Sequence, residues 1–243
     1  MMLLRLEGVG KNYGGVTALR GLSFNVAAGE IVGLMGANGA GKTTAFSLIA
    51  GTQRPSHGEI WFDGKRIDGK RAHELSRLGI GRTFQLVRPF SDLTVRGNIA
   101  VGALYGRQPA PSRAVAEARA EEILNEVHLA KLSDRLPGTL TLAQRKRLEI
   151  ARALATRPRL LLLDEVLAGL NAAEADDAFE MIRAVHAAHE LTIIIIEHVM
   201  RALMRLCGRV VVLHHGEKIA EGTPQDVAAD PRVVDSYFGA RAS

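Results

Sequence analysis

The sequence is poor in cysteine and in long apolar runs, and each shortage excludes a class of protein. Its 243 residues include one cysteine, Cys207. A single cysteine excludes an internal disulfide and is typical of a reducing cytoplasm, and we expect a small buried hydrophobe there. Apolar stretches such as residues 193–196 fall far short of the roughly 20 residues that a spanning helix needs. No signal peptide is expected at the start of the chain, so a membrane role would require a partner.

The charge of the chain is positive but dispersed. The formal net charge is +5 and the isoelectric point is near 9.6. Nucleic acid, an anionic membrane surface and general solubility are competing explanations of such a charge. Because the basic residues do not form one tract, we expect no nucleic-acid partner. The content of hydrophobic residues, 47%, is ordinary for a globular protein.

The spacing of apolar residues predicts an α/β fold. Residues 160–163, 192–196 and 210–213 are continuously apolar, as strands covered on both faces are. Other strands are expected at 3–6, 21–26, 30–35, 59–62 and 80–84, and helices at 42–50, after Ser112, at 144–155 and at 172–188. Residues 86–111 hold three prolines and are predicted to be irregular. We therefore expect one domain, with a core of residues 1–85 and 151–243 and a helical insert over 86–150.

A glycine-rich loop between a predicted strand and a predicted helix indicates a nucleoside triphosphate site. Residues 36–43 match G-x-x-x-x-G-K-[ST] in full. Glycines let consecutive N–H groups point at one phosphate, and the following helix adds its positive end. Lys42 would neutralise the β- and γ-phosphates, and Thr43 would offer its hydroxyl to Mg²⁺. The predicted nucleotide-binding residues of this loop are Gly36, Asn38, Gly39, Ala40, Gly41, Lys42, Thr43 and Thr44.

Two carboxylates follow the apolar run 160–163. A carboxylate at the tip of a buried strand is well placed to hold Mg²⁺, and we assign this role to Asp164. We assign to the adjacent Glu165 the role of the base that polarises the attacking water. His198 follows another predicted strand, where an imidazole can reach the γ-phosphate.

Together these motifs resemble the nucleotide-binding subunits of ABC transporters over essentially the whole chain. Tyr13 stands where that family stacks an aromatic ring on adenine, and Gln85 matches the glutamine between core and insert that contacts Mg²⁺ or the water. Residues 140–144 stand at the five-residue signature, residues 169–171 at the loop after the catalytic glutamate, and His198 at the switch histidine. Within the family, the Arg-Thr-Phe-Gln stretch and the Ala-Gly-Leu-Asn stretch resemble the importer ATPases for branched-chain amino acids and related amides.

The resemblance implies the fold and the working partners. The fold would be a P-loop NTPase (RecA-like) core with an antiparallel β portion and an inserted helical subdomain. The chain would bind ATP and Mg²⁺ and form a homodimer or a heterodimer with a sister ATPase, in which Thr141, Ala143 and Gln144 reach the partner's nucleotide. It would lie on the cytoplasmic face of the inner membrane, bound to transmembrane permease subunits and, through them, to a solute-binding protein. The transported solute is not encoded in the chain.

Three positions depart from the family pattern. Thr141-Leu142-Ala143 replaces Ser-Gly-Gly or Ser-Tyr-Gly, and if Ala143 needed a positive φ the methyl would cost about 1 kcal/mol. Val166 replaces a proline after the glutamate. Gly97 stands where relatives carry a glutamate three residues after Thr94, so a capping box is lost there.

Three other interpretations fit parts of the pattern. A P-loop kinase would share the phosphate loop but would leave Glu165, Gln85 and His198 unexplained. A nucleotide-gated subunit with low turnover would have an intact Lys42 and Glu165 behind an altered signature. An ABC protein of DNA repair or translation generally carries two such domains or long insertions.

Overall fold

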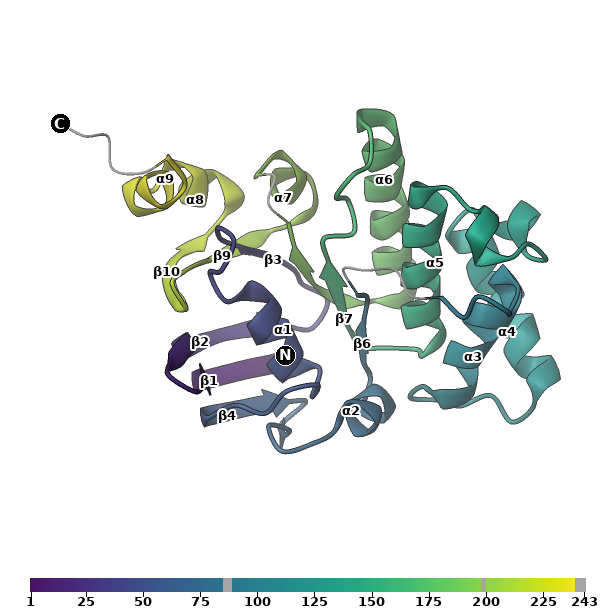
Figure 1. Cartoon of the computed structure of the whole chain (residues 1–243), viewed down its shortest axis with the longest axis horizontal. Helices are drawn as coiled ribbons and strands as arrows, with labels where there is room; N and C mark the ends of the chain where they lie inside the picture. The colour runs from purple at the N-terminus through teal and green to yellow at the C-terminus, as the bar shows by residue number, and fades with distance from the viewer. Residues whose placement is uncertain (85–88, 198–199, 239–243) are drawn as a thin grey trace. The chain divides into compact units, whose positions relative to one another are not determined.

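The apolar runs of the sequence form buried strands in the folded chain. The computed structural model describes residues 1–84, 89–197 and 200–238 (Figure 1). The chain forms two compact units. Unit 1 comprises Met1–Ala72 and Thr192–Ser243, and unit 2 comprises His73–Leu191. Each unit carries one part of the residues that the sequence assigns to nucleotide chemistry.

Unit 1 contains an antiparallel sheet built by the N-terminal part of the chain. Its strands lie in the order β2-β1-β4-β5, and their bounds are β1 Met2–Tyr13, β2 Val16–Ala27, β4 His57–Phe62 and β5 Lys65–Arg66. Leu4 pairs with Val26 and Leu6 with Phe24, and all four side chains are buried. This period-two burial places one face of the sheet against the core.

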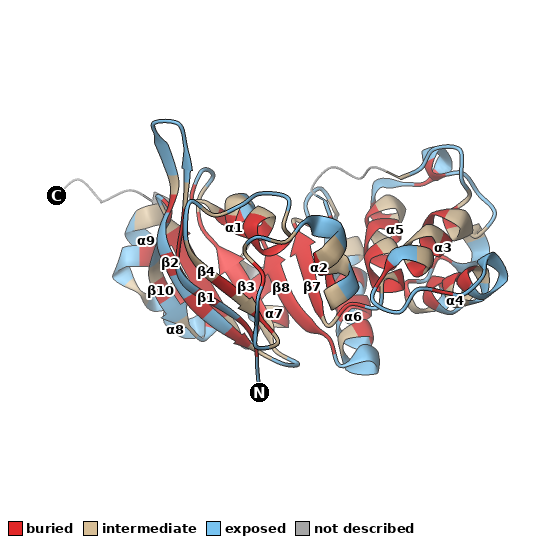
Figure 2. Ribbon diagram, turned by 90° about the horizontal axis from the view of Figure 1, so that it is seen from below, coloured by how far each residue is buried: buried red, intermediate tan, exposed pale blue. Residues whose placement is uncertain are grey.

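Unit 1 also carries the parallel strands that hold the phosphate loop. β3 (Ile31–Met35) pairs in parallel with β8 (Thr192–Ile196) on one side and β9 (Arg209–His214) on the other. β10 (Glu217–Gly222) pairs with β9 in antiparallel fashion. All of β8 and nearly all of β3 are buried, as expected for a central parallel strand (Figure 2). The helices are α1 Lys42–Ile49, α7 Met200–Leu206, α8 Pro224–Ala229 and α9 Pro231–Phe238.

Unit 2 is a group of helices with one pair of parallel strands. β6 (Ile80–Arg82) pairs in parallel with β7 (Leu160–Asp164). The helices are α2 Ala72–Leu78, at the boundary between the units, α3 Val95–Tyr105, α4 Arg113–Glu126, α5 Leu142–Ala155 and α6 Ala172–His189. Two short 3₁₀ turns, Ala130–Leu132 and Pro137–Thr139, precede α5. Helices α3, α4 and α5 pack on one another through their buried faces (Figure 2).

The prediction of an irregular stretch over residues 86–111 was wrong for α3. Val95, Ile99 and Ala103 recur at helical spacing and are fully buried. The three prolines lie outside the helix, so none of them interrupts it. Thr94 caps α3 by accepting a hydrogen bond from the Gly97 N–H at 3.1 Å, and glycine at that position has no side chain to complete a capping box.

Cys207 is a buried hydrophobe, as the sequence predicts. It is 7% exposed and lies under β3, where its Sγ packs close to Gly33. Burial, with a smaller effect from Glu197, raises the pKa of the thiol to about 12. Over the residues that the structure describes, no helix has the length and apolarity to cross a membrane.

Arg209 joins three segments of unit 1. Its guanidinium donates to both carboxylate oxygens of Glu30, at 2.7 and 2.9 Å, and to the Asn25 carbonyl at 2.7 Å. It also pairs with Glu221. Burial opposes the ionisation of Glu30, but the hydrogen bonds from Arg209 and from the Ala27 N–H outweigh it and lower the pKa of that carboxyl. The cluster therefore contributes to stability while Glu30 is ionised.

We expect Glu30→Gln to destabilise the protein by about 1.5–3 kcal/mol at neutral pH, because it removes the charge from these hydrogen bonds. The pKa of Glu30 is lower in the folded chain, so its contribution is complete above the unfolded pKa and is lost as pH falls through the folded one. Urea unfolding at several pH values measures this difference. The exposed pair Arg5–Glu7 provides the control, because Glu7→Gln should change stability little. A difference that stays constant into acid would contradict the assignment.

We expect the Cys207 thiol to resist maleimide at pH 8 in the native protein, because burial raises its pKa and blocks access. In urea one thiol per chain should react at the rate of a free cysteine. Mass spectrometry after timed labelling measures both rates. Rapid native labelling would show that α7 opens on the timescale of the reaction.

Candidate functional site

The loop between β3 and α1 has a backbone that favours glycine. Gly36, Gly39 and Gly41 have φ angles of 153°, 80° and 104°. A Cβ on Gly36 would lie 2.4 Å from the Leu213 carbonyl oxygen, which leaves no room for any side chain. These conformations turn the chain sharply, as a phosphate-binding loop requires.

The Lys42 side chain folds back over this loop. Its ammonium donates to the carbonyl oxygens of Gly36 at 2.6 Å and Ala37 at 3.0 Å, and the residue is buried. Lys42 also begins α1, and the preceding Gly41 has no side chain with which to cap the helix. The first N–H groups of α1 and its dipole therefore favour an anion at this end.

The remaining loop residues differ in exposure. Ala40 is buried, and its carbonyl accepts a hydrogen bond from the Gly216 N–H at 3.1 Å. Asn38, Gly39 and Thr43 are exposed, and Thr44 is half-buried. The structure thus brings the predicted phosphate-loop residues together in unit 1, with the Thr43 hydroxyl accessible to a ligand.

Tyr13 ends β1, also in unit 1. Its side chain is exposed, and the Lys11 ammonium lies 5.0 Å from the ring centroid. An exposed ring can accept a stacked base, and the adjacent cation suits a phosphate-bearing ligand.

Asp164 is the last residue of β7 in unit 2 and is buried. The Arg82 guanidinium donates to Asp164 Oδ2 at 3.0 Å, and both side chains lie almost wholly out of solvent. The Asp164 N–H donates to the Thr83 hydroxyl at 3.0 Å. The carboxylate is held in a defined orientation with a positive charge beside it, which offsets the cost of burying it.

Glu165 has a left-handed backbone. Its φ is 50°, a conformation that costs a residue other than glycine about 1–2 kcal/mol. The ammonium of Lys146, on α5, donates to the Glu165 carbonyl at 2.6 Å and is itself buried. Strain of this kind at a predicted catalytic residue supports a functional role for it. Val166, in place of the expected proline, is buried in the following turn.

The signature residues form the start of α5. Thr141 is the N-cap: its hydroxyl accepts from the Gln144 N–H at 3.3 Å, and Gln144 Oε1 accepts from the Thr141 N–H at 3.0 Å. This capping box ties two of the predicted contact residues to each other. Ala143 lies in the first helical turn and therefore has a negative φ. The condition under which its methyl would cost about 1 kcal/mol is not met in this structure.

The loop after Glu165 lies beside the signature. A Cβ on Gly169 would meet the Leu142 side chain at 3.0 Å, and Gly169 has a positive φ. Asn171 caps α6 through a second capping box with Glu174. Two predicted catalytic residues, Gln85 and His198, lie outside the described residues.

Sequence reasoning missed two residues of this site. Arg82 was noted only within a family motif, and Lys146 was taken as part of an ordinary helix. A basic residue inside an apolar helical stripe is a signal for Lys146, because such a residue is seldom buried without an acceptor. For Arg82 no local signal exists: the strand register pairs it with Leu162, two residues before Asp164, and its guanidinium then reaches that carboxylate.

Family models match most of the chain. The model of the ABC transporter family matches residues 19–168, and the model of the branched-chain amino acid ATP-binding cassette transporter matches residues 217–243. Together they cover the phosphate loop, the signature, the two carboxylates and the C-terminal end.

Curated relatives match over nearly their full length. The high-affinity branched-chain amino acid transport ATP-binding protein BraF of Pseudomonas aeruginosa is 38% identical, over 98% of this chain and 98% of that protein. The corresponding LivG of Escherichia coli is 36% identical with the same coverage. The lipopolysaccharide export system ATP-binding protein LptB of Acidithiobacillus ferridurans is 35% identical, over 98% of this chain and 97% of that protein.

Solved structures of ATP-binding cassettes are also similar to this chain over nearly its full length. The ADP conformation of an ATP-binding cassette of an ABC transporter superposes with a TM-score of 0.89 at 33% identity, covering 99% of this chain and 100% of that one. A dimeric post-hydrolysis cassette bound to ADP and Pi superposes with a TM-score of 0.82 at 25% identity, covering 91% of this chain and 99% of that one. The phosphate loop, the family models and these full-length matches lead to one conclusion: the chain belongs to the ABC transporter family, as an ATP-binding subunit.

Proposed function

We propose that the chain hydrolyses ATP to power the import of branched-chain amino acids or related small solutes. The full-length relatives BraF and LivG are named for branched-chain amino acid transport, and the family model of that transporter matches the C-terminal end. The similarity to LptB, a lipopolysaccharide export protein, extends over the same length at a lower identity. The C-terminal match therefore favours an amino-acid solute.

ATP would lie on the loop between β3 and α1. The observation that carries this proposal is the glycine backbone of that loop, with the Lys42 ammonium held over it and the uncapped start of α1 behind it. Its N–H groups and Lys42 would hold the phosphates, and Tyr13 would stack on the adenine.

The donors available for a divalent cation suit Mg²⁺. Thr43 offers an accessible hydroxyl and Asp164 a carboxylate oriented by Arg82, and hard oxygen donors are what Mg²⁺ prefers. Gln85 would add an amide oxygen. When bound, the ion would neutralise charge on the β- and γ-phosphates. Glu165 would orient and polarise the attacking water, and His198 would contact the γ-phosphate.

A second subunit would complete the site. Thr141, Ala143 and Gln144 stand at the start of α5, and we propose that this helix end faces the nucleotide of a partner subunit, identical or sister. A related cassette has been solved as a dimer bound to ADP and Pi, which supports this arrangement. Transmembrane permease subunits, and through them a solute-binding protein, would hold the dimer at the cytoplasmic face of the inner membrane.

We expect ATP hydrolysis by the purified chain to rise more than proportionally with protein concentration, because each site needs two subunits. Glu165→Gln should lower the turnover number by about a hundredfold or more while keeping Mg-ATP binding, since it removes the base and keeps the shape of the side chain. Steady-state phosphate release and nucleotide binding measure the two effects.

Two controls make this test decisive. Glu174→Gln alters an acid that caps α6 and is not one of the predicted nucleotide residues, so its turnover should remain that of the wild type. Transfer of the γ-phosphate to an acceptor other than water would indicate a kinase. Turnover per chain that is independent of concentration, in a sample shown to remain monomeric, would contradict the shared site.

We expect Ala143→Gly to lower stability by at most about 1 kcal/mol and to leave turnover unchanged, because Ala143 has helical geometry and glycine is a poorer helix former. Thermal unfolding and the ATPase assay measure both. A rise in turnover of about tenfold would show instead that the alanine methyl hinders the active dimer.

A further inference from the structure

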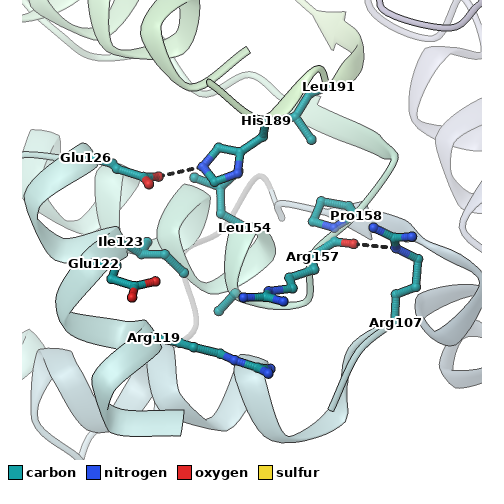
Figure 3. A pocket seen from close by; sticks show the side chains of 11 residues that line it. Arg107, Arg119, Glu122, Ile123, Glu126, Leu154, Arg157, Pro158, His189 and Leu191 are labelled. Atoms are coloured by element: carbon teal, nitrogen blue, oxygen red, sulfur yellow. Dashed lines mark hydrogen bonds and ion pairs between the residues drawn. The ribbon is translucent and has the colours of Figure 1, made fainter. Parts of the chain in front are cut away.

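Unit 2 holds a cavity of about 210 Å³ that the nucleotide chemistry does not use (Figure 3). Helix α4 lines one side, and the last turn of α5 with the residues leading into β7 lines the other. Its volume lies below the roughly 300–1,000 Å³ that is usual for drug-sized ligands. The cavity therefore suits a small molecule.

Three guanidinium groups border this cavity, and neutral oxygens hold them in place. Arg119 donates to the Gln108 carbonyl at 2.7 Å, and Arg157 donates to Gln108 Oε1 at 2.8 Å. Arg107 donates to the Arg157 carbonyl at 2.9 Å. Among the described residues, none of the three pairs with a carboxylate, so their charge is available to an anion.

Two carboxylates border the same cavity from α4. Figure 3 shows Glu122 and Glu126 on the left and Arg107 on the right, with Arg157 reaching between them. Glu126 contacts His189 at 2.7 Å. Glu122 has no ion-pair partner within the described part of the chain. Opposite charges thus border one cavity without meeting each other.

Aliphatic side chains form part of the cavity wall. Ile123, Leu154 and Leu191 line the cavity and are at least nine-tenths buried. Such a wall favours a branched hydrocarbon group, and each methylene buried there contributes about 0.8 kcal/mol.

We propose that this cavity binds a free α-amino acid with an apolar side chain. Its carboxylate would accept forked hydrogen bonds from Arg119 and Arg157, which suit a planar anion. Its ammonium would donate to Glu122, and its side chain would lie on Ile123 and Leu154. A ligand that carries both charges can contact the guanidinium groups and the Glu122 carboxylate at once. An anion or an amine alone would contact one of the two.

The site is separate from the nucleotide residues of unit 2. The cavity lies at the C-terminal end of α5, whereas the signature lies at its N-terminal end, about 20 Å away along a helix of 14 residues. The proposal rests on the residues that line the cavity and does not depend on which solute is transported. Failure of either proposal therefore leaves the other intact.

Leucine is the probe, and isothermal titration of the full-length chain measures its binding. Two compounds separate the charges: 4-methylpentanoate lacks the amine, and 3-methylbutylamine lacks the carboxylate. We expect leucine to bind and each half-ligand to bind at least about tenfold more weakly, because each loses one charged hydrogen-bond set. Equal binding of 4-methylpentanoate would overturn the proposal in favour of an anion site, and no binding of leucine up to its solubility limit would overturn it altogether.

Variants place the ligand in the cavity. Glu122→Gln and Arg119→Gln keep side-chain size and remove one charge each, and each should weaken leucine binding by about tenfold or more. Arg113→Gln is the matched control, because Arg113 lies on the same helix, exposed and paired with Glu117 outside the cavity. Circular dichroism confirms that each variant is folded. Binding that survives both cavity substitutions would overturn the assignment.

Discussion

The backbone between β3 and α1 has to turn in a space that admits no side chain, and the phosphate chemistry depends on this constraint. Gly36 passes against the carbonyl of Leu213 on β9, so the loop is fixed by the neighbouring strand as well as by its own glycines. The turn brings two carbonyl oxygens to the Lys42 ammonium and leaves the start of α1 without a side-chain cap. A residue with a Cβ at position 36 would displace either the strand or the loop.

Much of the fold follows from local patterns in the sequence. The strand 192–196 and the start of α6 at residue 172 lie where the spacing of apolar residues predicts them. The phosphate loop is equally local, because the glycines of its motif are the residues that can adopt the positive φ angles that the turn requires. Family resemblance supplied the antiparallel sheet, whose strands carry weaker patterns and whose pairing joins distant segments.

The missed features are those in which distant residues meet. Arg82 and Asp164 are neighbours only because β6 and β7 pair in a particular register, and Lys146 reaches Glu165 only because α5 packs beside that loop. Helix α3 was missed for a different reason. Its flanking prolines suggested a loop, while burial against α4 and α5 stabilises a helix whose residues have mixed propensity. The roles assigned to Gln85 and His198 remain predictions.

The contact between Lys146 and the Glu165 carbonyl couples the position of α5 to the backbone at Glu165. The ammonium is buried, so a rotation of α5 that withdrew it would break a hydrogen bond made by a buried charge and would be costly. The helix and the strained turn at Glu165 are therefore expected to move as one body. Any displacement imposed on the signature end of α5 would then be transmitted mechanically to the backbone of the glutamate, before a nucleotide or a water takes part.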